Sequence, residues 1–296
     1  MALLSLLSAA AATVDPIHFA DLGIKPYLFR LGWFELRWYS VAYITGIVFA
    51  YWHTVKAIRQ SGAPMAVRHC DDLFFYCTLG VILGGRLGYA TFYTGGNTGI
   101  PSLWANPLDM LKLWTGGMSF HGGLIGTALA MAWVAWRAKL NLLRVWDYVA
   151  VSVPMGMMLG RLANFVNGEL YGREAKGVAW AMVFPEDRLG LARHPSQLYE
   201  AGLEGALLLA VMLTLFWKTD ARFRPGLLTG AFGVGIGLSR FIVEYFREPD
   251  QQLQEFALRS GLSMGQWLSL PIIAIGMVLV VRGLMRPKLG AVAPSA

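Results

Sequence analysis

The chain has 296 residues, of which 56% are hydrophobic and only 15% are charged, and its mean hydropathy is +0.49. A water-soluble protein rarely has this composition, because its surface is largely polar. The net charge of +7 does not indicate nucleic-acid binding, because Lys and Arg are spread over many short segments and form no single basic stripe. The composition therefore favours an integral membrane protein.

Seven apolar segments are long enough to cross a bilayer as helices. Each is apolar around its whole circumference, whereas a helix of a soluble bundle keeps one polar face. We therefore predict an all-α membrane protein, a bundle of seven transmembrane helices that forms a single domain over residues 1–296. The predicted spans are residues 39–59, 71–94, 119–138, 146–166, 196–217, 225–246 and 264–285.

The segments outside the bundle (residues 39–285) predict its orientation. The N-terminal segment, residues 1–38, starts with apolar and small residues but has no Lys or Arg before them, so we expect a retained interfacial segment rather than a cleaved signal. Positive charge is concentrated in alternate connections, which predicts that these face the cytoplasm. The N-terminus is then outside, the C-terminus inside, and the longer loop insertions lie on the outer face. The basic pieces are residues 60–70, 139–145, 218–224 and the tail, 286–296.

Glycines four residues apart recur in the predicted spans and allow helix backbones to approach closely. The clearest sets are Gly80, Gly84 and Gly88 in the second span, and Gly122 and Gly126 in the third.

Cys70 and Cys77 are separated by two helical turns, too far for a disulfide within one helix, and we interpret them as packing residues. The chain has no HExxH, CxxC or GxSxG motif. We therefore expect no metal, no cofactor and no serine or cysteine nucleophile.

Polar side chains from several spans fall in the outer half of the membrane under this topology. Ionisable groups in hydrocarbon are costly unless they are paired or hydrated, so a cluster at one depth indicates a functional site. Separate structural salt bridges are the alternative, above all on the sixth span, where spacings of four and three residues allow pairing along one helix face. The polar residues are Arg86, His121, Arg161, Asn164, His194, Gln197, Glu200, Arg240, Glu244 and Arg247.

The stretch GRLANFVNGELYG, residues 160–172, ends the fourth span. Arg161 presents a planar, permanently charged fork that suits phosphate oxygens, and Arg240 is a second such group at the same depth. Glu169 can orient Arg161 or accept a hydroxyl from a head group, and Asn164 and Asn167 add neutral donors and acceptors. Gly168 and Gly172, which tolerate positive φ, predict that the helix ends here and the backbone turns.

A second motif, GGMSFHGGLIG, covers residues 116–126. His121, followed by Gly122, lies where a glycine-rich loop meets a helix, and the ordinary pKa of histidine, near 6.5, suits proton transfer. A hydrogen-bonded structural histidine is the alternative. The glycine-rich loop and the arginines at the same depth favour a functional role.

These residues resemble the prolipoprotein diacylglyceryl transferases, whose signature G-R-x-G-N-F-x-N-x-E-x-x-G matches residues 160–172 with Ala163 in place of a glycine. The resemblance continues through LRWYSVAYITG, LGGRLGYATFY, RHPSQLYEAGLEG, GLSRFIVEYFREPD and SMGQWLSLP, and covers most of the chain from Trp33 to Leu284. It implies a multi-pass enzyme of the bacterial plasma (inner) membrane with its active site toward the outer, periplasmic half. Such an enzyme moves the diacylglyceryl group of phosphatidylglycerol to the lipobox cysteine thiol of a prolipoprotein signal peptide and releases glycerol 1-phosphate.

The resemblance also implies roles for individual residues. His121, Arg161 and Arg240 are the expected catalytic residues, with His121 as the candidate base for the thiol and His194 as the weaker alternative. The expected partners are phosphatidylglycerol, lipobox signal peptides and membrane lipids, and no nucleic acid. Phosphatidylglycerol is expected to bind Arg161, Asn164, Glu169, Tyr39 and Arg240, with support from Gly122, Asn167, Gly172, Glu244, Arg247 and His194.

Two other classes remain as alternatives. A transporter would also bury charge within a bundle, but it usually has an inverted repeat and spans broken near the midplane, and the sequence shows neither. A lipid-binding membrane subunit with a buried anion site would not need His, Arg and Asn at one depth. Both are less consistent with the sequence than an enzyme.

Overall fold

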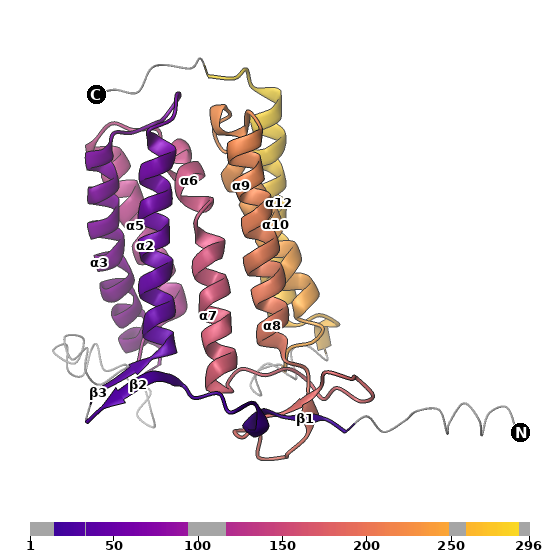
Figure 1. The fold of residues 1–296 in the computed structure, drawn as a ribbon. Helices are drawn as coiled ribbons and strands as arrows, with labels where there is room; N and C mark the ends of the chain where they lie inside the picture. Colours follow the sequence, from indigo (N-terminus) through magenta and orange to yellow (C-terminus); the bar gives the residue numbers. More distant parts are fainter. Residues whose placement is uncertain (1–14, 33, 94–116, 249–258, 290–296) are drawn as a thin grey trace, which may run out of the picture. The chain divides into compact units, whose positions relative to one another are not determined.

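The computed structural model describes residues 15–32, 34–93, 117–248 and 259–289, and most of them are helical (Figure 1). The α-helices are α2 (Trp38–Ile58), α3 (Val67–Phe92), α5 (Phe120–Arg137), α6 (Leu142–Ala150), α7 (Val153–Asn167), α8 (Ser196–Glu200), α9 (Leu208–Lys218), α10 (Leu227–Val243) and α12 (Met264–Met285). Two short 3-10 helices, η1 (Phe19–Leu22) and η6 (Ala221–Phe223), and a π-helix, η5 (Ala201–Leu207), complete the helical elements of these residues.

Two compact units divide the chain. The first contains Met1–Ala50 and Ala150–Pro287, and the second contains Tyr51–Val149 and Lys288–Ala296. Helices α7 to α12 therefore belong to the first unit, and α3 and α5 to the second. The prediction of a single domain stays a prediction.

Each of the seven predicted spans contains a helix, but not every helix is a candidate membrane span. Within the described residues, four helices are long and apolar enough to cross a membrane, or up to five if α6 and α7 form one interrupted span. α10 is apolar but shorter, and α5 is not among the candidates. The structure thus supports a mostly helical membrane protein with four or five candidate spans. The count of seven and the orientation of the ends stay predictions.

Three predicted pieces lie outside the described residues. They are residues 1–14 of the interfacial segment, the end of the second span and residues 290–296 of the tail.

The helices of the first unit pack through small residues. α10 and α12 run side by side (Figure 1), and a Cβ atom added to Gly230 would lie 2.7 Å from the carbonyl oxygen of Gly276. α12 begins with a capping box, in which the Ser263 hydroxyl accepts the Gln266 N–H and the Gln266 side chain accepts the Ser263 N–H. Small residues thus set the distance between the two helices, and the capping box fixes where α12 begins.

In the second unit, α3 and α5 pack glycine against glycine, as the four-residue spacing predicts. A Cβ on Gly80 would lie 2.5 Å from the Gly126 carbonyl oxygen, and one on Gly84 would lie 2.3 Å from that of Gly122. α5 begins at the N-cap Ser119, whose hydroxyl accepts the N–H of Gly122.

The strands of the described residues all belong to the first unit. β1 (Ile17–His18) pairs in parallel with β4 (Met182–Val183), which pairs antiparallel with β5 (Ala192–Arg193). β2 (Tyr27–Leu31) and β3 (Phe34–Arg37) form an antiparallel pair. Beside the three-stranded sheet, a small hydrophobic core ties the strands to the end of α7. It consists of Phe19, Met182 and Phe184, with Phe165 and Tyr171 packed against them.

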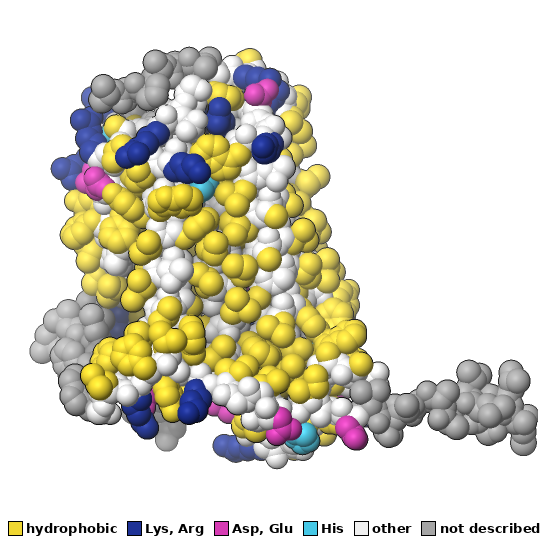
Figure 2. Space-filling view, viewed as in Figure 1, with side chains coloured by type: hydrophobic (Ala, Val, Ile, Leu, Met, Phe, Trp, Pro, Cys, Tyr) yellow, Lys and Arg dark blue, Asp and Glu magenta, His cyan; other side chains and the backbone are white. Residues whose placement is uncertain are grey.

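The helices present apolar side chains outward. Figure 2 shows hydrophobic side chains along the lengths of the helices, with Lys and Arg mainly near helix ends. On α12, for example, Ile275 and Val278 are 63% and 65% exposed. An apolar exterior of this kind suits lipid as the surrounding solvent.

Candidate active site

Two buried carboxylates lie at the centre of a group of charged residues in the first unit. Glu200 ends α8, and Glu204 follows four residues later in the π-helix η5; both side chains are 1% exposed. Arg161 reaches them from α7, with its Nε 2.5 Å from Oε2 of Glu200 and 3.9 Å from Oε2 of Glu204. The fourth and fifth predicted spans thus meet through opposite charges.

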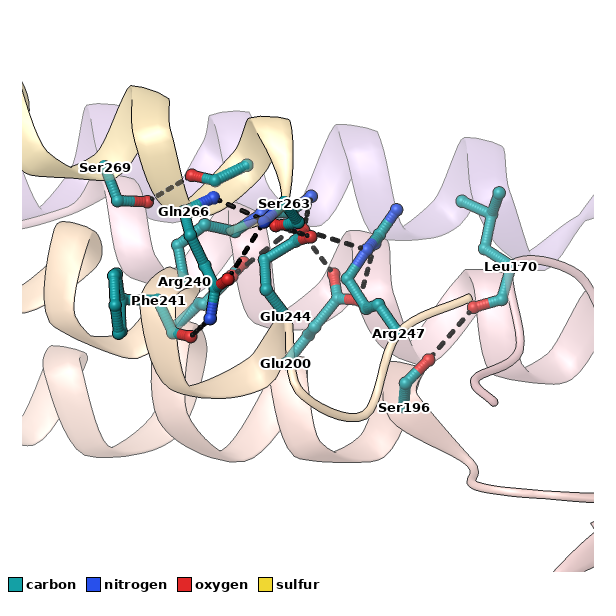
Figure 3. Close-up of polar contacts among 12 residues, drawn as sticks. Leu170, Ser196, Glu200, Arg240, Phe241, Glu244, Arg247, Ser263, Gln266 and Ser269 are labelled. Atoms are coloured by element: carbon teal, nitrogen blue, oxygen red, sulfur yellow. Dashed lines mark hydrogen bonds and ion pairs between the residues drawn. The ribbon is translucent and has the colours of Figure 1, made fainter. Parts of the chain in front are cut away.

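Arg240 and Arg247 approach Glu200 from α10 and the turn after it (Figure 3). Nη1 of Arg240 lies 3.6 Å from Oε2 of Glu200, and Nη1 of Arg247 donates to Oε1 of Glu200 at 2.7 Å. Both arginines also contact Oε1 of Glu244, Arg240 at 2.8 Å and Arg247 at 3.3 Å. The predicted helix-face pairing is therefore present, but it belongs to a larger network. We call Arg161, Glu200, Glu204, Arg240, Glu244 and Arg247 the charge cluster.

Glu244 is fixed from the side of α12. The Ser263 hydroxyl donates to Oε2 of Glu244 at 2.8 Å, and the capping box holds Ser263 in place. A Cβ on Gly265 would lie 2.5 Å from the Glu244 carboxyl carbon, so a larger residue there would displace this carboxylate. The start of α12 thus determines where the carboxylate that holds Arg240 lies.

The cluster leaves its arginines partly accessible while burying its carboxylates. The Arg161, Arg240 and Arg247 side chains are 24%, 28% and 18% exposed. Removing one partner of a buried ion pair leaves an uncompensated charge, which is strongly destabilising. The buried carboxylates therefore hold the arginines on their buried side. The exposed parts of the guanidinium groups can bind an anion.

The motif at residues 160–172 ends α7 as predicted. Gly168 is the C-cap, in the left-handed region at φ 71°. The next side chain, Glu169, accepts hydrogen bonds from Nδ2 of Asn164 at 2.7 Å and Nδ2 of Asn167 at 3.3 Å. We expected that Glu169 could orient Arg161. Its described partners are the two asparagines instead, and Glu200 holds Arg161.

The turn after α7 is bonded to the start of α8. Nε2 of Gln197 donates to the carbonyl of Glu169 at 2.6 Å, and the Ser196 hydroxyl donates to the carbonyl of Leu170 at 3.2 Å. Leu170 adopts a left-handed conformation, with φ 57°, which is uncommon for a residue other than glycine. These bonds bring the asparagine and glutamate of the motif beside the helix that carries Glu200.

Gly172 is required for a reason other than the one predicted. It is not among the described residues with positive φ; instead, a Cβ there would lie 2.2 Å from the carbonyl oxygen of Phe246. Gly172 forms a β-bridge with Arg247, and its N–H donates to the carbonyl of His194 at 2.8 Å. The expectation of a special backbone angle at Gly172 was wrong, and close packing of three backbone segments replaces it.

His194 lies in the loop before α8. Its Nδ1 is 3.1 Å from the Tyr199 hydroxyl, and its ring packs edge-on against Tyr199 and Phe246. Burial lowers the pKa of His194 below its usual value, because the charged imidazolium loses hydration. The neutral ring is thus favoured near pH 7.

A second buried ion pair stabilises the same loop. Nε and Nη2 of Arg193 donate to the two carboxylate oxygens of Asp187 at 2.8 and 3.1 Å, and Nη1 donates to Glu248 at 3.1 Å. This bidentate hydrogen bond lowers the pKa of Asp187. Arg193 also lies over the ring of Tyr171, at 5.4 Å.

The remaining predicted residues lie elsewhere in the described structure. Tyr39 is in the first turn of α2, in the first unit, and is 42% exposed. His121 and Gly122 are in the first turn of α5, in the second unit: His121 is exposed, and Gly122 packs against the backbone of Gly84. Arg86 is buried in α3 and donates to the carbonyl of Gly117. The roles of Tyr39 and His121 stay predictions.

Sequence reasoning left Glu204 out entirely and noted Glu200 without assigning it to the site. The available signal was the segment SQLYEAGLEGALLLA, in which two carboxylates four residues apart interrupt an apolar span. Among the described residues, no group of three or more His, Cys, Asp or Glu could hold a metal ion.

Comparisons with known proteins identify the family of this chain. The family model for prolipoprotein diacylglyceryl transferase matches residues 26–282. The chain is 58% identical over 281 residues to the phosphatidylglycerol–prolipoprotein diacylglyceryl transferase of Erythrobacter litoralis, covering 95% of this chain and 97% of that protein. It is 50% identical to the protein of the same name from Rhodospirillum rubrum, over 87% and 92% of the two chains, and 49% identical to that from Zymomonas mobilis, over 90% and 93%. The chain therefore belongs to the prolipoprotein diacylglyceryl transferase family.

Proposed function

We propose that the chain transfers the diacylglyceryl group of phosphatidylglycerol to the thiol of the lipobox cysteine in a prolipoprotein signal peptide. The observation that carries this proposal is the charge cluster, in which buried carboxylates hold Arg161 and Arg240 while both guanidinium groups stay partly exposed. Membership of the family supports the choice of substrates.

The reaction exchanges one bond to carbon for another. The cysteine sulfur attacks the carbon of the diacylglyceryl group that bears the phosphate. A carbon–sulfur thioether bond forms at this carbon, and its bond to the phosphate oxygen breaks. The phosphate keeps that bonding electron pair and leaves as glycerol 1-phosphate, and the thiol proton goes to a base. The nucleophile belongs to the substrate, which fits the packing role we give to Cys70 and Cys77.

In this proposal Arg161 and Arg240 bind the lipid phosphate. Negative charge builds up on the phosphate as the carbon–oxygen bond breaks, so donors aimed at it stabilise the transition state more than the bound lipid. Glu200 and Glu244 hold the two guanidinium groups in advance, which reduces the reorganisation needed during the reaction. Arg247 supports Arg240 through the shared oxygen of Glu244.

The polar turn after α7 is the proposed site for the head-group glycerol. Asn164, Asn167 and Glu169 already bond to one another, and the Glu169 carboxylate has further lone pairs that can accept a hydroxyl. Tyr39, which is exposed on α2, supplies a hydroxyl and an aromatic face for the lipid.

His121 is the proposed base for the thiol, with His194 as the alternative. A thiol of ordinary pKa, about 8.5, is mostly protonated near neutral pH, so a base or a positive field is needed to form the thiolate. His121 is exposed at the start of α5, whereas Nδ1 of His194 is within hydrogen-bond distance of Tyr199. The more accessible ring is the better candidate.

The proposed location is the bacterial inner membrane, with seven spans, the N-terminus outside and the site in the periplasmic half. The short basic connections support this orientation, and the apolar exterior of the helices supports a location in a membrane.

A mass measurement tests the proposed function. Purified full-length protein is incubated with phosphatidylglycerol and a synthetic lipobox peptide, and the peptide cysteine is expected to gain the mass of a diacylglyceryl group. A peptide with serine in place of that cysteine is the control. If the cysteine peptide gains no mass in membranes that preserve the folded protein, the proposal is wrong.

A further inference from the structure

Glu204 has the least compensated carboxylate of the charge cluster. Its nearest guanidinium nitrogens are Nη1 of Arg240 at 3.8 Å and Nε of Arg161 at 3.9 Å, both beyond hydrogen-bond distance. Its Oε1 is buried and has no hydrogen-bond partner among the described residues. Glu200 is equally buried, but it has nitrogens of Arg161 and Arg247 at 2.5 and 2.7 Å. The two carboxylates therefore have very different environments.

Such an environment favours the neutral acid. An ionised carboxylate without hydrogen bonds is costly to bury, and a second carboxylate nearby raises that cost further. Oε2 of Glu200, which Nε of Arg161 already contacts at 2.5 Å, lies 3.6 Å from the same Nη1 of Arg240 that faces Oε1 of Glu204. Protonation of Glu204 removes one of the two negative charges that share Nη1 of Arg240, and it adds an O–H donor.

The other charged groups of the cluster come from the helices around Glu204, and Arg161 and Arg240 lie nearest to its carboxylate. α7 contributes Arg161, α8 contributes Glu200, and α10 with the turn after it contributes Arg240, Glu244 and Arg247. α9 carries one titratable side chain, Lys218, at its opposite end. The cluster has three positive guanidinium groups. If only Glu200 and Glu244 carry negative charge, the net charge is one positive charge, and an ionised Glu204 would cancel it.

We propose that Glu204 is protonated at neutral pH and so leaves the charge cluster with a single positive charge, matched to the single negative charge of the phosphodiester in phosphatidylglycerol. The lipid assignment rests on the function proposed above. Glu204 is a positioning residue, since it acts on the lipid through Arg161 and Arg240. Its place in a π-helix fits this role, because π-turns are rare and often occur at functional sites.

Infrared spectroscopy of the ligand-free, full-length protein tests the proton directly. A neutral carboxylic acid has a carbonyl stretch that shifts in heavy water and that an ionised carboxylate lacks. This band should be present in the wild type at neutral pH, disappear at alkaline pH, and be missing from Glu204→Gln. Glu174→Gln is the matched control, because Glu174 is a partly exposed carboxylate paired with Lys176, and it should keep the band.

Lipid binding tests the consequence for charge. Phosphatidylglycerol is titrated into the protein in phosphatidylcholine nanodiscs at neutral and alkaline pH. Wild-type affinity should fall by roughly tenfold as Glu204 loses its proton, about the effect of one charge across ~10 Å at an effective dielectric constant of about 20. Glu204→Gln, which cannot ionise, should show no such fall.

A band that persists in Glu204→Gln, or equal pH dependence of lipid binding in the two proteins, would overturn the inference. If Glu204→Gln does not fold, Glu204→Asp serves instead and should shift the frequency of the band. The infrared result needs neither lipid nor transfer. Its failure would therefore leave the proposed transferase function standing, and failure of the transfer assay would leave the proton assignment standing.

Discussion

Nε of Arg161 lies 2.5 Å from Oε2 of Glu200, whose side chain is 1% exposed. The carboxylate is inaccessible to a substrate, so its contact with Arg161 serves to orient the guanidinium. Lysine at this position keeps the charge but loses the planar fork. We therefore expect Arg161→Lys and Arg240→Lys each to lower kcat by roughly 10²-fold or more, the scale of losing one preorganised donor to a developing anion.

Steady-state kinetics with the lipobox peptide, beside thermal unfolding in detergent, measure this prediction. Arg188→Lys is a matched control on an exposed loop. A folded variant with nearly full kcat and a raised KM for the lipid would mean that the arginines bind ground and transition states equally. Arg240 would then be mainly the structural partner of Glu244.

Gly172→Ala should destabilise the site by steric conflict. The added Cβ would lie 2.2 Å from the Phe246 carbonyl oxygen and 2.9 Å from that of His194, and backbone atoms cannot easily move away. We expect a loss of about 1–3 kcal/mol in unfolding free energy and lower transfer, because Arg247 follows Phe246 directly. Gly156→Ala is the control, since a Cβ there meets nothing within 4 Å. Equal melting temperatures for the two variants would contradict the packing argument.

Replacing both cysteines with alanine should leave transfer largely intact. Cys70 is buried and Cys77 is partly buried in α3, and both thiols are free. Removing two sulfur atoms from packed positions should cost stability, about 1 kcal/mol, but not chemistry. The mass assay on the double variant measures this, with melting temperature as a check on folding. Loss of turnover in a normally folded double variant would show that a cysteine takes part in the reaction.

His121 and His194 can be separated by substitution. If His121 is the base, His121→Asn should lower transfer by about 10²–10⁴-fold, the usual contribution of a general base, and His194→Asn should lower it less. The pH dependence of kcat/KM provides a second readout, since loss of the base should remove its limb from the profile. A larger defect in His194→Asn, with both variants folded, would reverse the assignment.

Stability should fall as the pH is lowered below about 6.5, the ordinary pKa of histidine. Burial lowers the pKa of His194 in the folded protein, so in this window the unfolded chain binds more protons and acid favours unfolding. Asp187, with its pKa lowered by Arg193, adds a further loss only below about pH 4. Melting temperatures between about pH 5 and 7 test this. His194→Phe keeps a ring against Tyr199 and Phe246 and should flatten the slope, whereas an unchanged slope would rule out His194 as its source.

The sequence predicted the features that depend on local spacing. Gly168 ends α7, Arg240 pairs with Glu244 one turn away, and the glycines of α3 face those of α5. Contacts between distant segments were less predictable. Glu200 and Glu204 lie about 40 residues along the chain from Arg161, and only the packing of α7 against α8 and the π-helix brings them to it.

The role of Gly172 was missed for a related reason. A glycine in a motif indicates either an unusual φ or a close approach, and sequence alone does not separate the two. The distinction depends on Phe246 and His194, which lie far along the chain and reach Gly172 only in the folded protein.

The glycine contacts between α3 and α5 also limit how a membrane lipid can travel. A diacyl lipid that moves sideways out of the bilayer needs a gap between two helices that is wide enough for its tails. The α3–α5 pair has none, since a single methyl group on Gly80 would already collide with the Gly126 carbonyl, and Gly230 and Gly276 close the α10–α12 pair in the same way. At these contacts the two helices of each pair therefore leave no space for a lipid tail.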